Sequence, residues 1–265
     1  MRREEALLAR VGARRGEPAT RARLAELQRA WCFAQPFHNL DLLAGARHGA
    51  PPLDREAALA RCSDGLGGPC HVQSWGFLSL LQLAGFDARL CGATIAQPDD
   101  HLLVHVTLGN EAYLCDVGNG QPYLEPFPLD RTHDQRHVGW IVRSTPERDE
   151  LVLTRRSPDQ PEWRVVYRAR PRARRWEDFA RSIERHHRER GFGPFLSGLR
   201  VVRITATSMV AVRDEQVTIY GEDGFERARL TEAALVRFIA RDLDLAALPV
   251  EDAVATWRAA LDGRA

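Results

Sequence analysis

Apolar side chains recur at helical spacing through the first third of the chain. The clearest stretches share an apolar face at Leu24, Leu27 and Trp31, and then, after Cys70, at Trp75, Phe77, Leu78 and Leu81. A further segment has Asp54 as a helix cap and continues to Ala60. We therefore expect a helical region over residues 1–85, in which the last helix ends near Gly85.

Short apolar and β-branched runs separated by Gly, Pro and Asp turns follow over residues 86–175. The runs are Leu102 to Leu108, Val138 to Val142, Leu151 to Leu153 and Trp163 to Tyr167. Runs of this length predict an antiparallel sheet or barrel. Gly109-Asn110 is a turn signal, which makes the segments that carry His101 and Asp116 a hairpin.

Helical and strand patterns alternate over residues 176–265. A helix is predicted from Trp176 to about Arg190, and another opens at Thr231. The strands expected between them are Leu199 to Thr205, Met209 to Val212 and Val217 to Tyr220. The chain contains no internal repeat and no low-complexity linker, so its pattern predicts three consecutive regions of an α+β fold.

Cys70 is the candidate nucleophile. Gly67-Gly68-Pro69-Cys70 opens the predicted helix, with Pro69 at its first position, so Cys70 lies in the first turn. The unpaired N–H groups and the positive end of the helix dipole favour a thiolate there. A free cysteine, with a pKa of about 8.5, is only a few per cent thiolate at neutral pH, so an activated thiol needs a second group.

His101 and Asp116 are the candidate partners of Cys70, because an imidazole can take the thiol proton and a carboxylate can fix the imidazole tautomer. His101 and His105 share one strand face but lie about 13 Å apart at about 3.3 Å per residue, so only one can serve the cysteine. Taken singly, each of these residue types is more often structural. The ordered combination of cysteine, histidine and aspartate favours catalysis.

The chain resembles an arylamine N-acetyltransferase, a family built around a Cys-His-Asp triad. The similar pieces are Pro36-Phe37-His38-Asn39-Leu40-Asp41, Gly67-Gly68-Pro69-Cys70, the His101-to-Asp116 hairpin, Asp-Val-Gly-x-Gly from Asp116, Trp176-Glu177-Asp178-Phe179 and Pro194-Phe195-Leu196. The resemblance implies a helical region (1–85) that carries the nucleophile, an antiparallel β-barrel (86–175) that carries the histidine and aspartate, and an α/β lid (176–265). Its site geometry would be related to that of papain-like cysteine enzymes.

The resemblance also implies ping-pong acyl transfer. Cys70 would accept an acetyl or other acyl group from a coenzyme A thioester and pass it to an arylamine, hydrazine or related amine. His101 would move protons in both steps, and Asp116 would orient the His101 ring. No permanently bound cofactor and no metal are expected, with acetyl-CoA or another acyl thioester as co-substrate. The substrate-binding residues would be Phe37, Val104, Gly118, Asn119 and Gly120.

Departures from the family pattern cluster near Cys70. Family members usually carry Glu and Arg, which form an ion pair, where this chain has His38 and Leu66. They carry Glu or Gln near Val72 and Asn near Ser74, and often a larger or hydroxylated residue at Asn119. Because loss of both charged partners is easier to tolerate than loss of one, we expect a repacked site.

Three alternatives stay open at this point. The first is an amide synthase that releases or cyclises a polyketide chain from an acyl carrier protein. The second is a transglutaminase-like or protease-like enzyme, in which a protein amine or water takes the acyl group. The third is a non-catalytic homologue with a decayed site.

The amino-acid composition excludes several further classes of protein and of chemistry. The 265 residues contain 37 basic side chains, all of them arginine, which excludes lysine Schiff-base chemistry and a lysine-bearing phosphate loop. The net charge of +1 gives no general drive towards nucleic acid. No segment has the roughly 20 apolar residues of a membrane span, and the N-terminus lacks a secretory apolar stretch, so we expect a cytoplasmic protein. Five cysteines without a C-x-x-C pair indicate reduced thiols rather than a disulfide framework.

Three polar clusters remain. Cys62, Cys70 and His71 have no spacing typical of a zinc site, and His186-His187 is interpreted as a solvated helix face. The arginine run consists of Arg168, Arg170, Arg172, Arg174 and Arg175. It is interpreted first as a solvated basic stretch, and otherwise as a binding site for the phosphates of coenzyme A or the acidic face of a carrier protein.

Overall fold

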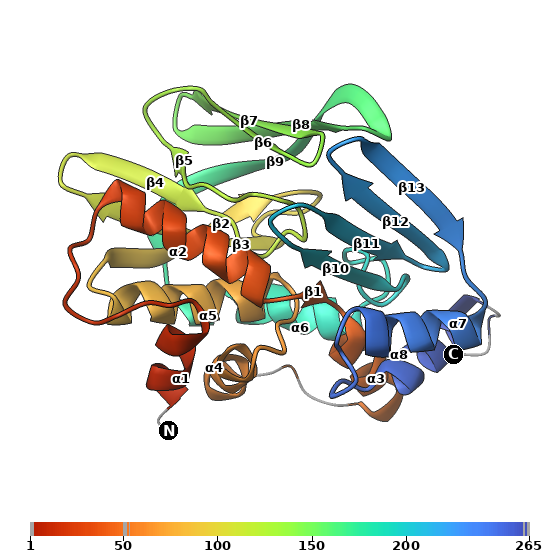
Figure 1. Cartoon of the computed structure of the whole chain (residues 1–265). Coiled ribbons are helices and arrows are strands. Elements are labelled where there is room, and N and C mark those ends of the chain that lie inside the picture. Colours follow the sequence, from red (N-terminus) through yellow and green to blue (C-terminus); the bar gives the residue numbers. More distant parts are fainter. Residues whose placement is uncertain (1–2, 50–51, 53, 262, 264–265) are drawn as a thin grey trace.

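The computed structural model describes residues 3–49, 52, 54–261 and 263. Its first third is helical, as the apolar spacing predicted (Figure 1). The helices are α1 (Arg3–Arg10), α2 (Arg21–Ala34), α3 (Leu40–His48), α4 (Arg55–Asp64) and α5 (Cys70–Leu83). Asp54 caps α4, where its Oδ1 accepts the Ala57 N–H at 2.8 Å, so the predicted cap is confirmed.

An eight-stranded antiparallel sheet forms the middle of the chain and curls into a nearly closed barrel. Its strands, in spatial order, are β5 (Phe127–Pro128), β4 (Glu111–Cys115), β3 (His101–Leu108), β2 (Asp87–Thr94), β9 (Gln160–Arg174), β8 (Glu150–Ser157), β7 (Trp140–Glu147) and β6 (His133–His137). The Gln135 side chain in β6 hydrogen-bonds both the N–H and the carbonyl of Glu125, just before β5. These two bonds join the outer strands of the barrel.

A second, five-stranded antiparallel sheet lies beside the barrel (Figure 1). Its order is β1 (Phe37–His38), β10 (Arg200–Ile204), β11 (Met209–Arg213), β12 (Gln216–Gly221) and β13 (Gly224–Arg229). Phe37 pairs with Val202 in this sheet. The sheet thus brings a residue from the helical third of the chain against strands from its last third.

The remaining helical elements belong to the last third of the chain. They are a 3-10 turn (Trp176–Phe179), α6 (Ala180–Arg188), α7 (Glu232–Arg237), a π turn (Phe238–Asp242) and α8 (Val250–Leu261). The helix expected from Trp176 thus begins as a 3-10 turn, which Asp178 stabilises by accepting the Arg175 N–H at 2.9 Å. Helix α8 packs against α3. None of the helices in the described part of the chain is long and apolar enough to cross a membrane.

Helix α5 is buried almost all round, between the barrel and the neighbouring helices. It packs against α4 on one side and against β2 and β3 on the other. The fold is therefore α+β, as the family resemblance implied, and the helical region and the barrel meet along α5. Cys70, the first residue of α5, lies 2% exposed at this junction.

Candidate active site

Cys70 is the first residue of α5 with helical geometry. Pro69 is the N-cap, with extended backbone angles (φ −75°, ψ 179°), so the proline lies one position earlier than the sequence pattern predicted. The first helical hydrogen bond runs from the Gln73 N–H to the Pro69 carbonyl. The N–H groups of Cys70, His71 and Val72 therefore precede the first helical bond and carry the positive end of the helix dipole.

The loop before Cys70 is held against β1. Gly67 has φ +63°, and a Cβ atom at this position would collide with the Pro36 carbonyl oxygen, so only glycine fits. The Gly68 N–H donates to that same carbonyl at 3.1 Å, and the Gly68 carbonyl accepts the His38 N–H at 3.4 Å. The two glycines therefore allow the cysteine loop and β1 to lie backbone against backbone.

Two polar residues of α5 fix the orientation of the helix. The Gln73 amide accepts a hydrogen bond from Trp31 Nε1 at 2.8 Å and donates to the Pro36 carbonyl at 2.8 Å. Ser74 Oγ donates to the Leu102 carbonyl at 2.8 Å, which ties α5 to the strand residue that follows His101. The serine that departs from the family pattern is thus used to hold α5 against β3.

His101 and Asp116 form a buried hydrogen-bonded pair. His101 Nε2 lies 3.0 Å from Asp116 Oδ2, and Asp116 Oδ1 accepts the Gly118 N–H at 3.0 Å. The last paired residues of the hairpin are Val104 and Cys115. Continuing that register puts Asp116 on the same face as His101 but diagonal to it, a distance that the two side chains span. The expected hairpin contact is present.

The surroundings of His101 favour the protonated form of its imidazole. Burial alone would lower the pKa of its imidazole, but the charge and hydrogen bond of Asp116 outweigh burial, and interaction with Cys70 adds to them. The combined effect raises the His101 pKa to about 10. Because Asp116 occupies Nε2, the other ring nitrogen, Nδ1, is the one left to face Cys70. His105 is only half-buried and lies further along β3; burial lowers the pKa of its imidazole, and the charge of Asp87 offsets this only in part.

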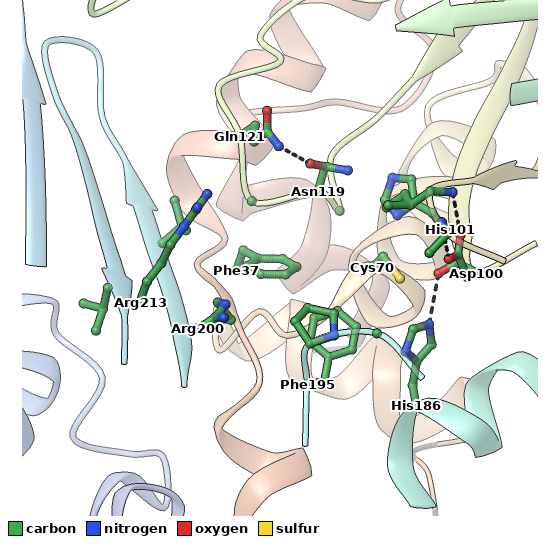
Figure 2. Close-up of a pocket in the computed structure, with 18 residues that line it drawn as sticks. Phe37, Cys70, Asp100, His101, Asn119, Gln121, His186, Phe195, Arg200 and Arg213 are labelled. Carbon is green, nitrogen blue, oxygen red and sulfur yellow. Dashed lines mark hydrogen bonds between the residues drawn. The ribbon is translucent and has the colours of Figure 1, made fainter. Parts of the chain in front are cut away.

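A cavity of about 410 Å³ opens in front of Cys70 and His101 (Figure 2). Of the residues that the sequence singled out, Phe37, Gly118, Asn119 and Gly120 also line it. Asp116 lies behind His101, away from the cavity lining. Val104 packs in the hydrophobic core beneath and is absent from that lining.

The sequence pattern did not identify several residues of the cavity wall. These are Ile95, Ala96, Asp100, Gln121, His186, Gly193, Pro194, Phe195, Arg200, Val202, Val212 and Arg213. His186 was expected on a solvated helix face, and this is wrong, because it is 3% exposed and its Nε2 hydrogen-bonds the Asp100 carbonyl at 2.9 Å. Only Pro194 and Phe195 carried a sequence signal, as part of the family-like segment.

Polar side chains of the loop after Asp116 form a chain of hydrogen bonds at the cavity wall. Tyr123 Oη donates to Gln121 Oε1 at 2.8 Å, and Gln121 Nε2 donates to Asn119 Oδ1 at 2.7 Å. This chain fixes the Asn119 amide with its oxygen already occupied. Its Nδ2 group is therefore available as a donor to a ligand.

The departures at positions 38 and 66 produce a direct contact between the two residues. His38 Nε2 donates to the Leu66 carbonyl at 2.7 Å, and His38 Nδ1 accepts the Leu40 N–H at 3.3 Å. This arrangement needs a neutral imidazole, and burial lowers the His38 pKa to about 4. The site is repacked around a neutral histidine, in agreement with the expectation from sequence.

An ion pair is still present nearby, on other residues. Arg61 Nη2 lies 2.6 Å from Asp41 Oδ2, with side chains 16% and 21% exposed. Arg61 Nε also donates to the Gly67 carbonyl at 3.4 Å. The pair therefore connects α3 and α4 and contacts the loop that carries Cys70.

The arginine run lies in β9, outside this cavity. Arg168, Arg170, Arg172 and Arg174 line a separate cavity of about 370 Å³. Each of them is ion-paired, the partners being Glu147, Glu150, Asp149, Asp99 and Asp178. Their charges are thus already balanced by protein carboxylates.

No group of three or more His, Cys, Asp or Glu side chains in the described part of the chain is arranged to hold a metal ion. His71 lies with its Nε2 3.4 Å from His187 Nε2, and burial lowers the pKa of both imidazoles. The two rings pack α5 against α6.

Comparison with known proteins places these features in context. A family model described as N-acetyltransferase matches residues 21–247. No curated protein matches the chain.

Several solved structures with the same fold are arylamine N-acetyltransferases. That of Mycobacterium marinum has a TM-score of 0.83 at 22% identity, covering 96% of this chain and 98% of its own. The same protein in complex with CoA has a TM-score of 0.81 at 22% identity, with 98% of each chain covered. The enzyme of Salmonella typhimurium has a TM-score of 0.82 at 19% identity, with 98% and 99% covered.

Proposed function

The chain belongs to the arylamine N-acetyltransferase family, and from the chemistry of its cavity we propose that it moves an acyl group from a coenzyme A thioester to an aromatic amine through acyl-Cys70. The observation that carries the proposal is the buried His101–Asp116 pair, which favours an imidazolium beside a cysteine at a helix N-terminus. That arrangement favours a thiolate.

In the first half-reaction, the Cys70 sulfur attacks the thioester carbonyl carbon. The carbonyl oxygen becomes an oxyanion, which the N–H of Cys70 at the start of α5 can stabilise. The bond between the acyl carbon and the coenzyme A sulfur then breaks. The leaving sulfur takes the His101 proton, which leaves acyl-Cys70, neutral His101 and free coenzyme A.

In the second half-reaction, the amine nitrogen attacks the acyl carbon and gives a proton to His101. The bond to the Cys70 sulfur breaks, the electron pair returns to sulfur, and the amide leaves. Acylation removes the contribution of Cys70 to the raised pKa of His101, which makes the imidazole a better base for this step. Asp116 holds Nε2 throughout, so that Nδ1 always faces the reacting atoms.

Acetyl-CoA is the donor that we propose to be used first. Among the structural neighbours, the M. marinum enzyme is a complex with CoA. The ion-paired arginines of β9 are not needed for this assignment, because their charges are already balanced.

Steady-state kinetics with acetyl-CoA and a panel of arylamines test the proposal. We expect double-reciprocal plots to be parallel, as for a ping-pong reaction, and Cys70→Ala to lose transfer while keeping its far-UV circular dichroism. Intersecting lines, or full activity of Cys70→Ala, would contradict acyl-Cys70. Activity with longer pantetheine thioesters alone would favour the amide-synthase alternative, and release of free acid would favour hydrolysis.

A further inference from the structure

Two consecutive histidines of α6 lie against the two elements that carry the proposed catalytic pair. His186 Nε2 lies 2.9 Å from the carbonyl oxygen of Asp100, the residue directly before His101. His187 Nε2 lies 3.4 Å from Nε2 of His71, which follows the nucleophile in α5. Side chains of consecutive helical residues point about 100° apart, so α6 reaches the start of β3 with one ring and α5 with the other.

His186 is a buried side chain in the wall of the cavity. It is 3% exposed and lines the same cavity as Cys70 and His101. Burial lowers the His186 pKa, and the hydrogen bond and charge of Asp100 offset this only in part, so the neutral ring is favoured. A carbonyl oxygen can only accept, so in the neutral ring Nε2 carries the hydrogen and donates it.

The bond acts on the peptide group between Asp100 and His101. A trans peptide group is planar and rigid, so a donor that fixes the Asp100 carbonyl also fixes the N–H of His101 in the same plane. Figure 2 shows this bond at the Cys70 end of the cavity. His186 therefore constrains the backbone from which the His101 imidazole projects.

The start of β3 is paired on one side only. Its pairing with β2 extends to Ala93 opposite His101, whereas its pairing with β4 stops at Val104 opposite Cys115. The first residues of β3 thus lack the support that a second neighbouring strand would give. The α6 ring supplies a donor just where that support ends.

The Asp100 side chain anchors the loop that precedes β3. Its Oδ1 accepts the Ile95 N–H at 2.8 Å, and its Oδ2 accepts the N–H groups of the next two residues at 2.9 and 2.8 Å. Asp100 is itself 7% exposed. Its carboxylate holds the loop while its carbonyl is held by His186, so both sides of the residue are fixed.

From these contacts we propose that His186 is a positioning residue for the reaction. By holding the Asp100 carbonyl, it keeps the His101 ring directed at the Cys70 sulfur. It acts through the backbone and needs no contact with either substrate. The inference rests on the proposed function, since it names a further residue on which the same thiol–imidazole pair depends. Without this donor the pair would lose its alignment, and the thiolate would lose the stabilisation that the imidazolium gives it.

Aromatic packing is the competing role for the His186 ring. Its centroid lies 4.6 Å from that of Phe192 and 5.0 Å from that of Phe195, and a Cβ atom on Gly193 would lie 3.0 Å from its Nδ1. A ring that only filled this space would need no donor nitrogen. Leucine and glutamine at position 186 both remove the ring, but only glutamine can donate to the carbonyl, so the two substitutions separate the roles.

The test measures the pH dependence of iodoacetamide alkylation at Cys70, followed by peptide mass, in wild type, His186→Leu and His186→Gln. We expect His186→Leu to raise the pKa of the Cys70 thiol by about one unit and to lower kcat/KM for acetyl-CoA by about tenfold. His186→Gln should recover most of both effects. His105→Leu, in the same strand as His101 but outside the cavity lining, is the control and should leave the thiol pKa unchanged.

Equal losses in His186→Gln and His186→Leu would assign the effect to ring packing and overturn the proposal, as would an unchanged thiol pKa in His186→Leu. Urea melts establish that each variant is folded, and His186→Met, with an unbranched side chain, carries the same expectation if leucine does not fit. Alkylation needs no acyl transfer. A shifted thiol pKa together with a wild type that transfers no acyl group would contradict the proposed function and still support the role of His186.

Discussion

The backbone of Gly118 lies directly against Cys70. A Cβ atom added at Gly118 would come within 2.7 Å of Cys70 Cα and 3.0 Å of Cys70 Cβ. The same glycine donates its N–H to Asp116 Oδ1. One residue thus connects the loop that carries the aspartate to the residue proposed as nucleophile.

Gly118→Ala should therefore displace Cys70 from His101. We expect the rate of acetyl transfer to fall by more than about tenfold and the free energy of unfolding to fall by about 1–3 kcal/mol, because the added methyl meets backbone. Gly221→Ala is the matched control, since its Cβ would meet open space without positive φ. Kinetics and urea melts of both variants measure the effect, and wild-type activity in Gly118→Ala would show that the contact is not tight.

Asp116→Asn should keep the fold and impair catalysis. The amide cannot stabilise imidazolium as a carboxylate does, so kcat/KM should fall by about 10²- to 10⁴-fold. The His101 pKa, raised to about 10 in the native protein, should fall in the variant. NMR titration of the His101 ring measures this shift. Asp130→Asn, at an exposed site, is the control, and an unchanged His101 pKa in Asp116→Asn would contradict the assignment.

His38 should make the protein less stable in acid. Its folded pKa of about 4 lies below the unfolded value of about 6.5, so the neutral form is favoured by folding. That contribution is complete above pH 6.5 and is lost as the pH falls towards 4. The slope of unfolding free energy against pH over this range should be smaller in His38→Gln than in wild type. The exposed His48→Gln is the control, and an identical slope in His38→Gln would contradict the neutral buried imidazole.

The Asp41–Arg61 pair should behave as a coupled unit. Asp41→Asn and Arg61→Gln each leave a partly buried charge without its partner, so each should lower the free energy of unfolding by about 1–3 kcal/mol. The double variant should lose less than the sum of the two, and urea melts of all four proteins give the coupling energy. Strict additivity would show that the two charges do not interact.

Much of the proposed catalytic group was predictable because its signals are local. Gly67, Gly68 and Cys70 specify a tight loop that leads into a helix, and turn residues in the hairpin fix the register that brings His101 and Asp116 together. The loop and the hairpin turn are both determined by residues that are close together in the sequence. Neither of these two local structures depends on pairing between strands that are distant in the sequence.

The cavity wall formed by β1, β10 and β11 was not predictable, for the opposite reason. Phe37 meets Val202 only because β1 pairs with β10, and Arg200 faces Arg213 only through the register of β10 and β11. The pattern of apolar and polar residues within each strand does not indicate which strands are neighbours in the sheet. Strand β13 was missed because its side chains are mostly exposed, which removes the alternation of apolar and polar residues that marks a half-buried strand.

Transfer through acyl-Cys70 is tested most directly by the intact mass of the protein after incubation with acetyl-CoA alone. Wild type should gain one acetyl group, which an arylamine then removes as the amide, while Cys70→Ala should gain none. An acetyl group on both proteins, or on wild type but not removed by any amine, would contradict transfer through acyl-Cys70.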